Sequence, residues 1–167
     1  LGIDRDTYSR TYSGTAYKWR YKLEETGFKY HGNSITAAMA LVALRYLEED
    51  NEYRRTVARW YDEQLAGCPN LESVPMASGC KPSRYLYQVL APHRDETIVG
   101  LNQQSIYPGV HYADNTGCPM YSYAWGQCPR AAEAARRVLS LPMHLQLRQE
   151  DVHRVASALR SLLASSS

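Results

Sequence analysis

The stretch from Asn33 to Leu47 constrains the fold more than any other part of the sequence. Its apolar residues recur at helical spacing on two opposite sides. One side carries Ile35, Ala38, Met39, Val42, Ala43, Tyr46 and Leu47, and the other carries Ala37, Ala40, Leu41 and Leu44. Asn33 or Ser34 can cap the start of such a helix. Because a helix that is apolar all round is a buried helix, the pattern predicts a position between two domains or two subunits.

The chain has 167 residues, which is enough for one domain with a genuine core and short for two. Its formal net charge of +2 is too weak to indicate binding to nucleic acid or to a membrane surface. No apolar run approaches the ~20 residues that span a bilayer, and no basic-then-apolar signal peptide opens the sequence. These features favour a globular protein of the cytoplasm.

Four cysteines are spread along the chain, and none of them forms a C-x-x-C pair. A zinc site needs closer pairing or a neighbouring His pair, so we expect no metal site. Free thiols in a cytoplasmic protein are the favoured interpretation. A disulfide between Cys118 and Cys128, which flank a loop-like stretch, stays open as an alternative.

The rest of the sequence predicts helices with short strands between them. Polar residues at 48–51 are expected to interrupt the first helix, and a second helix follows from Tyr53 to Leu65 and closes at Gly67. Further elements are expected as helices at 95–104, 129–139 and 150–163, strands at 85–90 and 106–112, an extended connection at 139–142, and loops at 68–83 and 113–127. This order predicts an α+β fold in which helices pack on a small, mostly antiparallel sheet.

Catalytic sequence motifs are missing: there is no glycine-rich phosphate loop, no G-x-S-x-G and no H-E-x-x-H. His111 is the most interesting histidine, because it lies with Tyr112 at a predicted strand end before a long loop, where binding groups commonly sit. Lys29 and His31 precede the apolar helix, and a cation there could meet an anion at the helix N-terminus. For each of these groups an ordinary half-buried or solvated role is the alternative.

Several stretches of sequence, taken in order, carry a family resemblance. They are Gly27 to Tyr30 with Ile35 to Ala38, Arg54-Arg55 with Tyr61 to Leu65, Gly109 to Tyr112 with Pro119 and Tyr121, and Val138 to His144 with Glu150 to Val152. Their order and spacing resemble the C-terminal part of sugar aminotransferases of the DegT type. These are enzymes that depend on pyridoxal 5'-phosphate (PLP) and have the aspartate-aminotransferase fold.

The resemblance implies that residues 1–33 are a lead-in from a large PLP-binding domain and that residues 34–167 are the C-terminal small domain. In the family the large domain carries the Schiff-base lysine, so none of the four lysines here is expected to be catalytic and the chain alone is expected to be inactive. Lys29 matches a position that reaches the cofactor phosphate of the partner subunit in a homodimer, and His31 lies beside it. His111 and Tyr112 match positions near the nucleotide-sugar substrate, whereas Leu139 to Met143 is expected only to pack the domain.

The sequence also departs from the family pattern, which predicts a divergent member. The departures are His31 to Ser34 after the Lys29-Tyr30 pair and Ala113 to Gly117 after the His111-Tyr112 pair. The leading hypothesis is part of an aminotransferase that acts on a keto sugar, and the absence of an initiating Met favours it. The alternatives are a non-catalytic dimerisation or ligand-binding module of the same origin, and a nucleic-acid binder that uses the aromatic and basic residues at 17–22.

Overall fold

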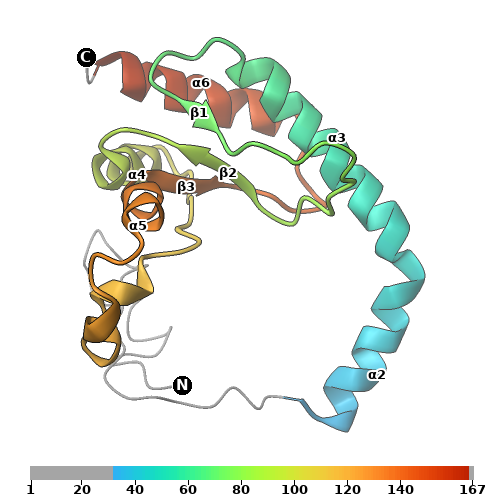
Figure 1. The fold of residues 1–167 in the computed structure, drawn as a ribbon. Coiled ribbons are helices and arrows are strands. Elements are labelled where there is room, and N and C mark those ends of the chain that lie inside the picture. Colours follow the sequence, from blue (N-terminus) through green and yellow to red (C-terminus); the bar gives the residue numbers. More distant parts are fainter. Residues whose placement is uncertain (1–31, 166–167) are drawn as a thin grey trace.

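The computed structural model describes residues 32–165, and these residues form the α+β fold that the sequence predicts (Figure 1). The elements in chain order are α2 (Ser34–Ala43), η1 (Leu44–Tyr46), α3 (Leu47–Leu65), β1 (Glu72–Ser73), β2 (Tyr87–Leu90), α4 (Arg94–Gln103), η2 (Asn115–Gly117), η3 (Pro119–Ala124), α5 (Pro129–Arg137), β3 (Val138–Leu141) and α6 (Gln149–Ser165). The division at residue 33 into a lead-in and a small domain stays a prediction.

A three-stranded antiparallel sheet with the order β1-β2-β3 lies at the centre of the described residues. In the central strand β2, Leu90 pairs with Glu72 of β1 and with Val138 of β3. Helix α5 leads directly into β3, so no loop separates the expected helix and the expected extended segment. The sheet is therefore small and entirely antiparallel.

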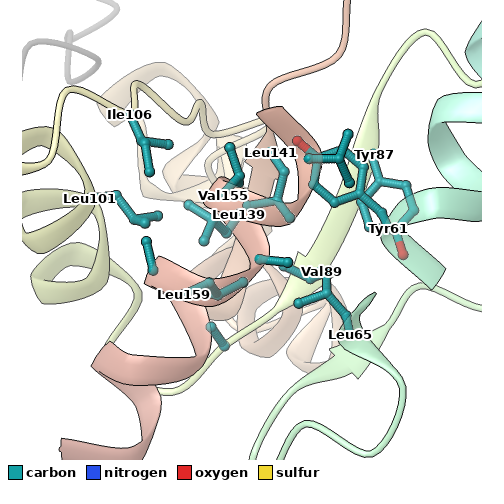
Figure 2. Close-up of a cluster of buried hydrophobic side chains, with 14 of the residues drawn as sticks. Tyr61, Leu65, Tyr87, Val89, Leu101, Ile106, Leu139, Leu141, Val155 and Leu159 are labelled. Carbon is teal, nitrogen blue, oxygen red and sulfur yellow. The ribbon is translucent and has the colours of Figure 1, made fainter. Parts of the chain in front are cut away.

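The hydrophobic core fills the space between this sheet and helices α3, α4 and α6 (Figure 2). Helix α6 packs against both α3 and α4. The largest side chains that are fully buried are Tyr61, Ile98, Leu101, Leu139, Leu159 and Leu163. The expected apolar stripe of the last helix is confirmed, because Val152, Val155, Ala156, Leu159 and Leu163 are all buried.

Three tyrosine hydroxyls donate hydrogen bonds to groups in distant segments of the chain and so fix how these segments pack together. Tyr61 of α3 donates to the carbonyl oxygen of Pro142 at 2.9 Å, and Tyr53 donates to that of Leu147 at 2.8 Å. Tyr87 of β2 stacks on Tyr61 with ring centroids 4.7 Å apart and donates to the Asp62 carboxylate at 2.7 Å. Burial raises the pKa of both Tyr61 and Tyr87, so these phenols stay protonated and act as donors.

Two arginines of α6 bond the backbone carbonyls at the ends of neighbouring helices. Arg160 donates to the carbonyl oxygens of Gln64 and Ala66 at the end of α3, and Arg154 donates to that of Gln104 at the end of α4. The last carbonyls of a helix have no partner within the helix and carry a partial negative charge. The guanidinium groups therefore satisfy these carbonyls while they hold α6 in place.

Helices α2 and η1, with the first residue of α3, form an apolar arm, residues 34–47, that stands away from the sheet (Figure 1). The expected helix and its N-cap are confirmed: the Asn33 side chain accepts a hydrogen bond from the Thr36 amide at 2.8 Å. The arm is exposed within this chain, since Ile35 is 74%, Met39 69% and Leu41 67% accessible. Any burial of the arm must come from surfaces outside the described residues.

The expected interruption at residues 48–51 is wrong, because α3 continues through them to Leu65. Glutamate is a good helix former, and acidic residues as a class suit the first turn of a helix, where the dipole favours negative charge. Glu48 and Glu52 also pair with Arg55 at 2.8 and 2.7 Å. The helix end at Leu65 and the positive φ of Gly67 agree with the sequence-based expectation.

The strand expected at 106–112 is also wrong. Only a single bridge, between Gly109 and Ser140, joins this segment to the sheet. Gly109 exchanges both of its backbone hydrogen bonds with Ser140, and no other residue between 106 and 112 bonds the backbone of β3. Conversely, the loop expected at 68–83 contains β1, and the loop expected at 113–127 contains the 3-10 helices η2 and η3.

Candidate functional site

The segment that carries His111 is fastened to the free edge of β3. Gly109 and Ser140 exchange two backbone hydrogen bonds, with the Gly109 amide 2.9 Å from the Ser140 carbonyl oxygen and the Ser140 amide 2.8 Å from the Gly109 carbonyl oxygen. Gln88 of the central strand donates from Nε2 to the carbonyl oxygen of His111 at 2.5 Å. The backbone on both sides of His111 is thus tied to two strands of the sheet.

The His111 ring is held by a buried hydroxyl. Its Nδ1 lies 2.9 Å from Oγ of Ser140, a side chain that is only 3% accessible in the middle of β3. Burial lowers the pKa of His111, so the ring is neutral at neutral pH. A neutral imidazole bonded at Nδ1 presents Nε2 as either a donor or an acceptor, and Nε2 has no hydrogen-bond partner among residues 32–165.

Tyr112 follows His111 through a cis peptide bond and projects into solvent, where its side chain is 65% accessible. The two rings lie edge to face with centroids 5.1 Å apart. A neutral imidazole and an exposed phenol next to each other can donate or accept hydrogen bonds to hydroxyl or phosphate groups. The two rings thus lie side by side at the edge of the sheet, and their role toward a substrate stays a prediction.

Lys29 and His31, the other two predicted site residues, lie outside the described residues. The helix start that they precede is described: Asn33 Oδ1 accepts from both the amide and the hydroxyl of Thr36. The roles of Lys29 and His31 toward a phosphate stay predictions.

The described residues do not form a PLP site by themselves. Lys81 is the one lysine between residues 32 and 165, and it lies in an exposed loop 3.1 Å from Glu48 and 3.7 Å from Glu52. An exposed amine that is paired with carboxylates on the surface lacks the enclosure that covalent catalysis needs. Among residues 32–165, no lysine is therefore placed for Schiff-base formation.

Other potential sites in this part of the chain are unremarkable chemically. A cavity of about 420 Å³ is lined by Tyr107, Pro142, His144, Asp151 and Arg154 among others. His144 accepts a hydrogen bond from the Gln146 amide at its Nδ1, so it caps a turn. Across residues 32–165 there is no cluster of three or more metal-ligating side chains, and no helix there is long and apolar enough to cross a membrane.

All four cysteines are free thiols. The alternative of a bridge between Cys118 and Cys128 is therefore wrong. Cys68 is buried, and burial raises the pKa of its thiol, which makes it a packing residue that is poorly reactive.

Sequence reasoning did not identify the residues that hold His111. We expected the segment Leu139 to Met143 only to pack the domain, yet Ser140 bonds the imidazole directly. A polar residue inside an apolar strand was the available signal: Ser140 stands between Leu139 and Leu141, and Gln88 stands between Tyr87 and Val89. A buried polar side chain in such a place needs a partner, and here that partner is the His111 residue.

The fold of this chain is similar to that of solved aminotransferases. The aminotransferase TlmJ from Streptoalloteichus hindustanus superposes with a TM-score of 0.75 at 29% sequence identity, over 90% of this chain and 41% of its own. DesV from S. venezuelae, solved in complex with a ketimine intermediate, gives 0.74 at 29% identity, over 85% of this chain and 39% of its own.

The chain belongs to the DegT/DnrJ/EryC1/StrS aminotransferase family, whose sequence model matches residues 5–160. A relative from Saccharopolyspora spinosa, a dTDP-4-dehydro-2,3,6-trideoxy-D-glucose 4-aminotransferase, is 36% identical over 83% of this chain and 36% of its own length. A UDP-N-acetyl-3-dehydro-alpha-D-glucosamine 3-aminotransferase from Acidithiobacillus ferrooxidans is 28% identical over 86% of this chain and 39% of its own length. The chain thus spans about two fifths of the length of these relatives.

Proposed function

We propose that this chain is the C-terminal part of a PLP-dependent aminotransferase that acts on a keto sugar linked to a nucleotide. The observation that carries the proposal is the family match over residues 5–160, together with relatives that are named as aminotransferases of nucleotide-linked keto sugars. In such a reaction the C=O group of the sugar becomes C–NH₂, and an amino donor such as glutamate becomes a 2-keto acid.

In this proposal the chain contributes substrate contacts and leaves the covalent chemistry to residues outside it. PLP, when bound, would carry the amino group between donor and sugar. His111 Nε2 and the Tyr112 hydroxyl would hydrogen-bond the diphosphate or the sugar hydroxyls of the substrate. The neutral state of His111 suits this role, because a neutral ring can accept from a hydroxyl as well as donate to a phosphate.

Lys29 and His31 are proposed to bind the phosphate of PLP ahead of the α2 N-terminus. A lysine ammonium is a compact positive charge that suits a phosphate. The proposed Schiff-base lysine lies outside the 167 residues, which is supported by the surface pairing of Lys81 with Glu48 and Glu52. The chain alone is therefore proposed to be inactive.

The apolar arm, residues 34–47, is proposed to be covered by the large PLP-binding domain and by a second subunit of a homodimer. Its exposed side chains form a larger apolar surface than a monomer ordinarily leaves in water. Light scattering of the chain should show association, and Leu41→Glu should reduce it. A monomer that binds no hydrophobic dye would count against a covered arm.

Localisation in the cytoplasm forms part of the same proposal. It is supported by the four free thiols, since a reducing compartment keeps cysteines unpaired.

A non-catalytic dimerisation or ligand-binding module is the alternative, and the exposed arm is the feature that favours it. The test is an amino-transfer assay on the polypeptide that includes the upstream domain, with PLP, glutamate and a nucleotide-linked keto sugar. We expect formation of the amino sugar together with 2-oxoglutarate, and no product from the 167-residue chain. An upstream polypeptide that binds PLP but transfers no amino group to any keto sugar would support the module.

A further inference from the structure

The geometry points to Ser140 as a positioning residue that, with Gly109 and Gln88, fixes the His111 ring and leaves Nε2 as the ring nitrogen available to the substrate. This inference deepens the proposed function and rests on it. It assigns to β2 and β3 a part in substrate binding, although neither strand contributes a side chain that would touch the substrate.

The first step is the pairing of Ser140 with His111. The Ser140 hydroxyl is buried, and the Nδ1 atom of His111 at 2.9 Å is its one hydrogen-bond partner among residues 32–165. A buried hydroxyl without a partner costs free energy, so the pair stabilises one ring orientation over the others. The hydroxyl can donate to Nδ1 or accept from it, so the pair fixes the orientation of the ring and leaves Nε2 free to accept or to donate.

The second step concerns Gly109, which provides space for the ring. A Cβ atom at this position would lie 2.6 Å from Cε1 of His111 and 3.3 Å from its Nδ1. Gly109 does not have a positive φ, so backbone conformation does not explain the glycine. The imidazole thus lies against the Gly109 backbone, and any larger residue there would push it away from Ser140.

The third step is the backbone of His111. Gln88 donates to its carbonyl oxygen at 2.5 Å, and the Gly109–Ser140 bridge holds the chain two residues earlier. With the backbone fixed on both sides and Nδ1 occupied, the ring has little freedom left. Ordering a binding group before the ligand arrives reduces the entropy that binding must overcome.

The test begins with nuclear magnetic resonance of the isotopically labelled 167-residue chain. In the unaltered chain we expect a strong cross-peak between His111 Hε1 and the Gly109 α-protons, because the ring lies against the Gly109 backbone. Ser140→Ala should weaken this cross-peak, because the ring loses the contact that orients it, whereas Ser140→Thr, which keeps the hydroxyl, should retain it. Ser73→Ala is the matched control, because it makes the same change in β1 on the other side of β2.

The second readout is steady-state kinetics of the complete aminotransferase that contains the chain. Ser140→Ala and Gly109→Ala should raise KM for the nucleotide-linked keto sugar by up to about tenfold, the loss expected for one hydrogen bond, and change kcat less. The KM of the amino donor should not change. Ser140→Thr should restore KM.

The outcomes separate the inference from the proposed function. An unchanged cross-peak between His111 and Gly109 in Ser140→Ala would overturn the inference, and so would a weakened cross-peak with an unchanged KM in an active enzyme. An unaltered complete enzyme without amino-transfer activity would instead overturn the proposed function, and with it the substrate role of the ring.

Discussion

The apolar arm and the core helices differ in what covers their hydrophobic side chains. The arm and the second half of α3 are parts of one nearly continuous helical run, from Ser34 to Leu65 (Figure 1). Val57, Ala58, Tyr61 and Leu65 are buried against the sheet and α6, whereas no side chain of α2 is buried. The C-terminal half of this helical run therefore packs against other elements of the same chain, whereas its N-terminal half does not.

This difference shows what apolar periodicity can and cannot reveal. The pattern predicts that a segment forms a helix and that its apolar surface needs cover. The pattern does not reveal whether the surface that packs against these residues belongs to the same chain. The second half of α3 stabilises this domain, whereas the arm stabilises the domain only when another surface binds it.

The largest expected difference is in the free energy of unfolding, between a variant that truncates a leucine of the core and one that truncates a leucine of the arm. Leu159 is fully buried in α6, so Leu159→Ala should lower the free energy of unfolding by about 2–5 kcal/mol, because it removes buried methyl groups and leaves a cavity. Leu41→Ala in the arm should leave the unfolding of the dilute chain nearly unchanged. Urea titration of both variants measures the contrast, and equal losses would show that the two regions do not differ as described.

A smaller effect is expected from removing a single hydroxyl. Tyr61→Phe deletes the hydrogen bond to the Pro142 carbonyl and leaves that carbonyl unsatisfied, which should cost about 1–2 kcal/mol. Tyr46→Phe is the matched change in the arm, where the side chain is exposed, and it should cost nothing measurable. Thermal unfolding of the two variants compares them; a neutral Tyr61→Phe would mean that this contact contributes nothing.

The next expected effect is a pH dependence of the stability, which arises from His111 at the edge of the sheet. Burial places the pKa of folded His111 below the ordinary value of 6.5, so the unfolded chain takes up this proton first as the pH falls. The stability contributed by the neutral ring is complete above pH 6.5 and declines as the pH falls through that value toward the lower, folded pKa. His111→Gln should remove this part of the decline.

Urea midpoints measured between pH 7.5 and 5 check this expectation. The control variant His153→Gln, which alters an exposed histidine of α6, leaves the His111 ring in place and should keep the decline. A His111→Gln profile that matches that of the unaltered chain would contradict the burial of the ring.

The smallest change in stability is expected from a substitution at the junction between the arm and the core. Glu48 pairs with Arg55 and Lys81 on the surface, and these partners hold the pKa of its carboxyl below its usual range. Exposed ion pairs contribute little to stability. Glu48→Gln should therefore shift the melting temperature by no measurable amount, and a clear loss would show that this network fixes the arm to the core.

Much of the fold could be predicted from the sequence because helical periodicity is a local signal. Helix α6, with its buried stripe from Val152 to Leu163, and helix α4, with Ile98 and Leu101 inward, follow from spacing alone. The two-residue strand β1 could not be predicted, because its pairing partner Val89-Leu90 lies distant in the sequence. The strand expected at 106–112 failed for the opposite reason: its alternation is a local pattern, but only Gly109 of this segment pairs with the sheet.

The candidate site was predictable in part. His111 and Tyr112 could be selected as adjacent polar residues before a long loop, but Ser140 and Gln88 reach His111 from 29 and 23 residues away. Such contacts depend on strand register, which local patterns do not reveal. The space that Gly109 leaves for the imidazole is likewise visible only in three dimensions.

The central claim is that this chain is the C-terminal part of an aminotransferase whose cofactor lysine lies outside it. Borohydride trapping of PLP followed by peptide mapping tests this claim most directly, on the 167-residue chain and on the polypeptide that includes the upstream domain. The account predicts one trapped cofactor on a lysine upstream of Leu1 in the longer polypeptide and no stoichiometric label in the 167-residue chain. A stoichiometric label on Lys18, Lys22, Lys29 or Lys81 would contradict it.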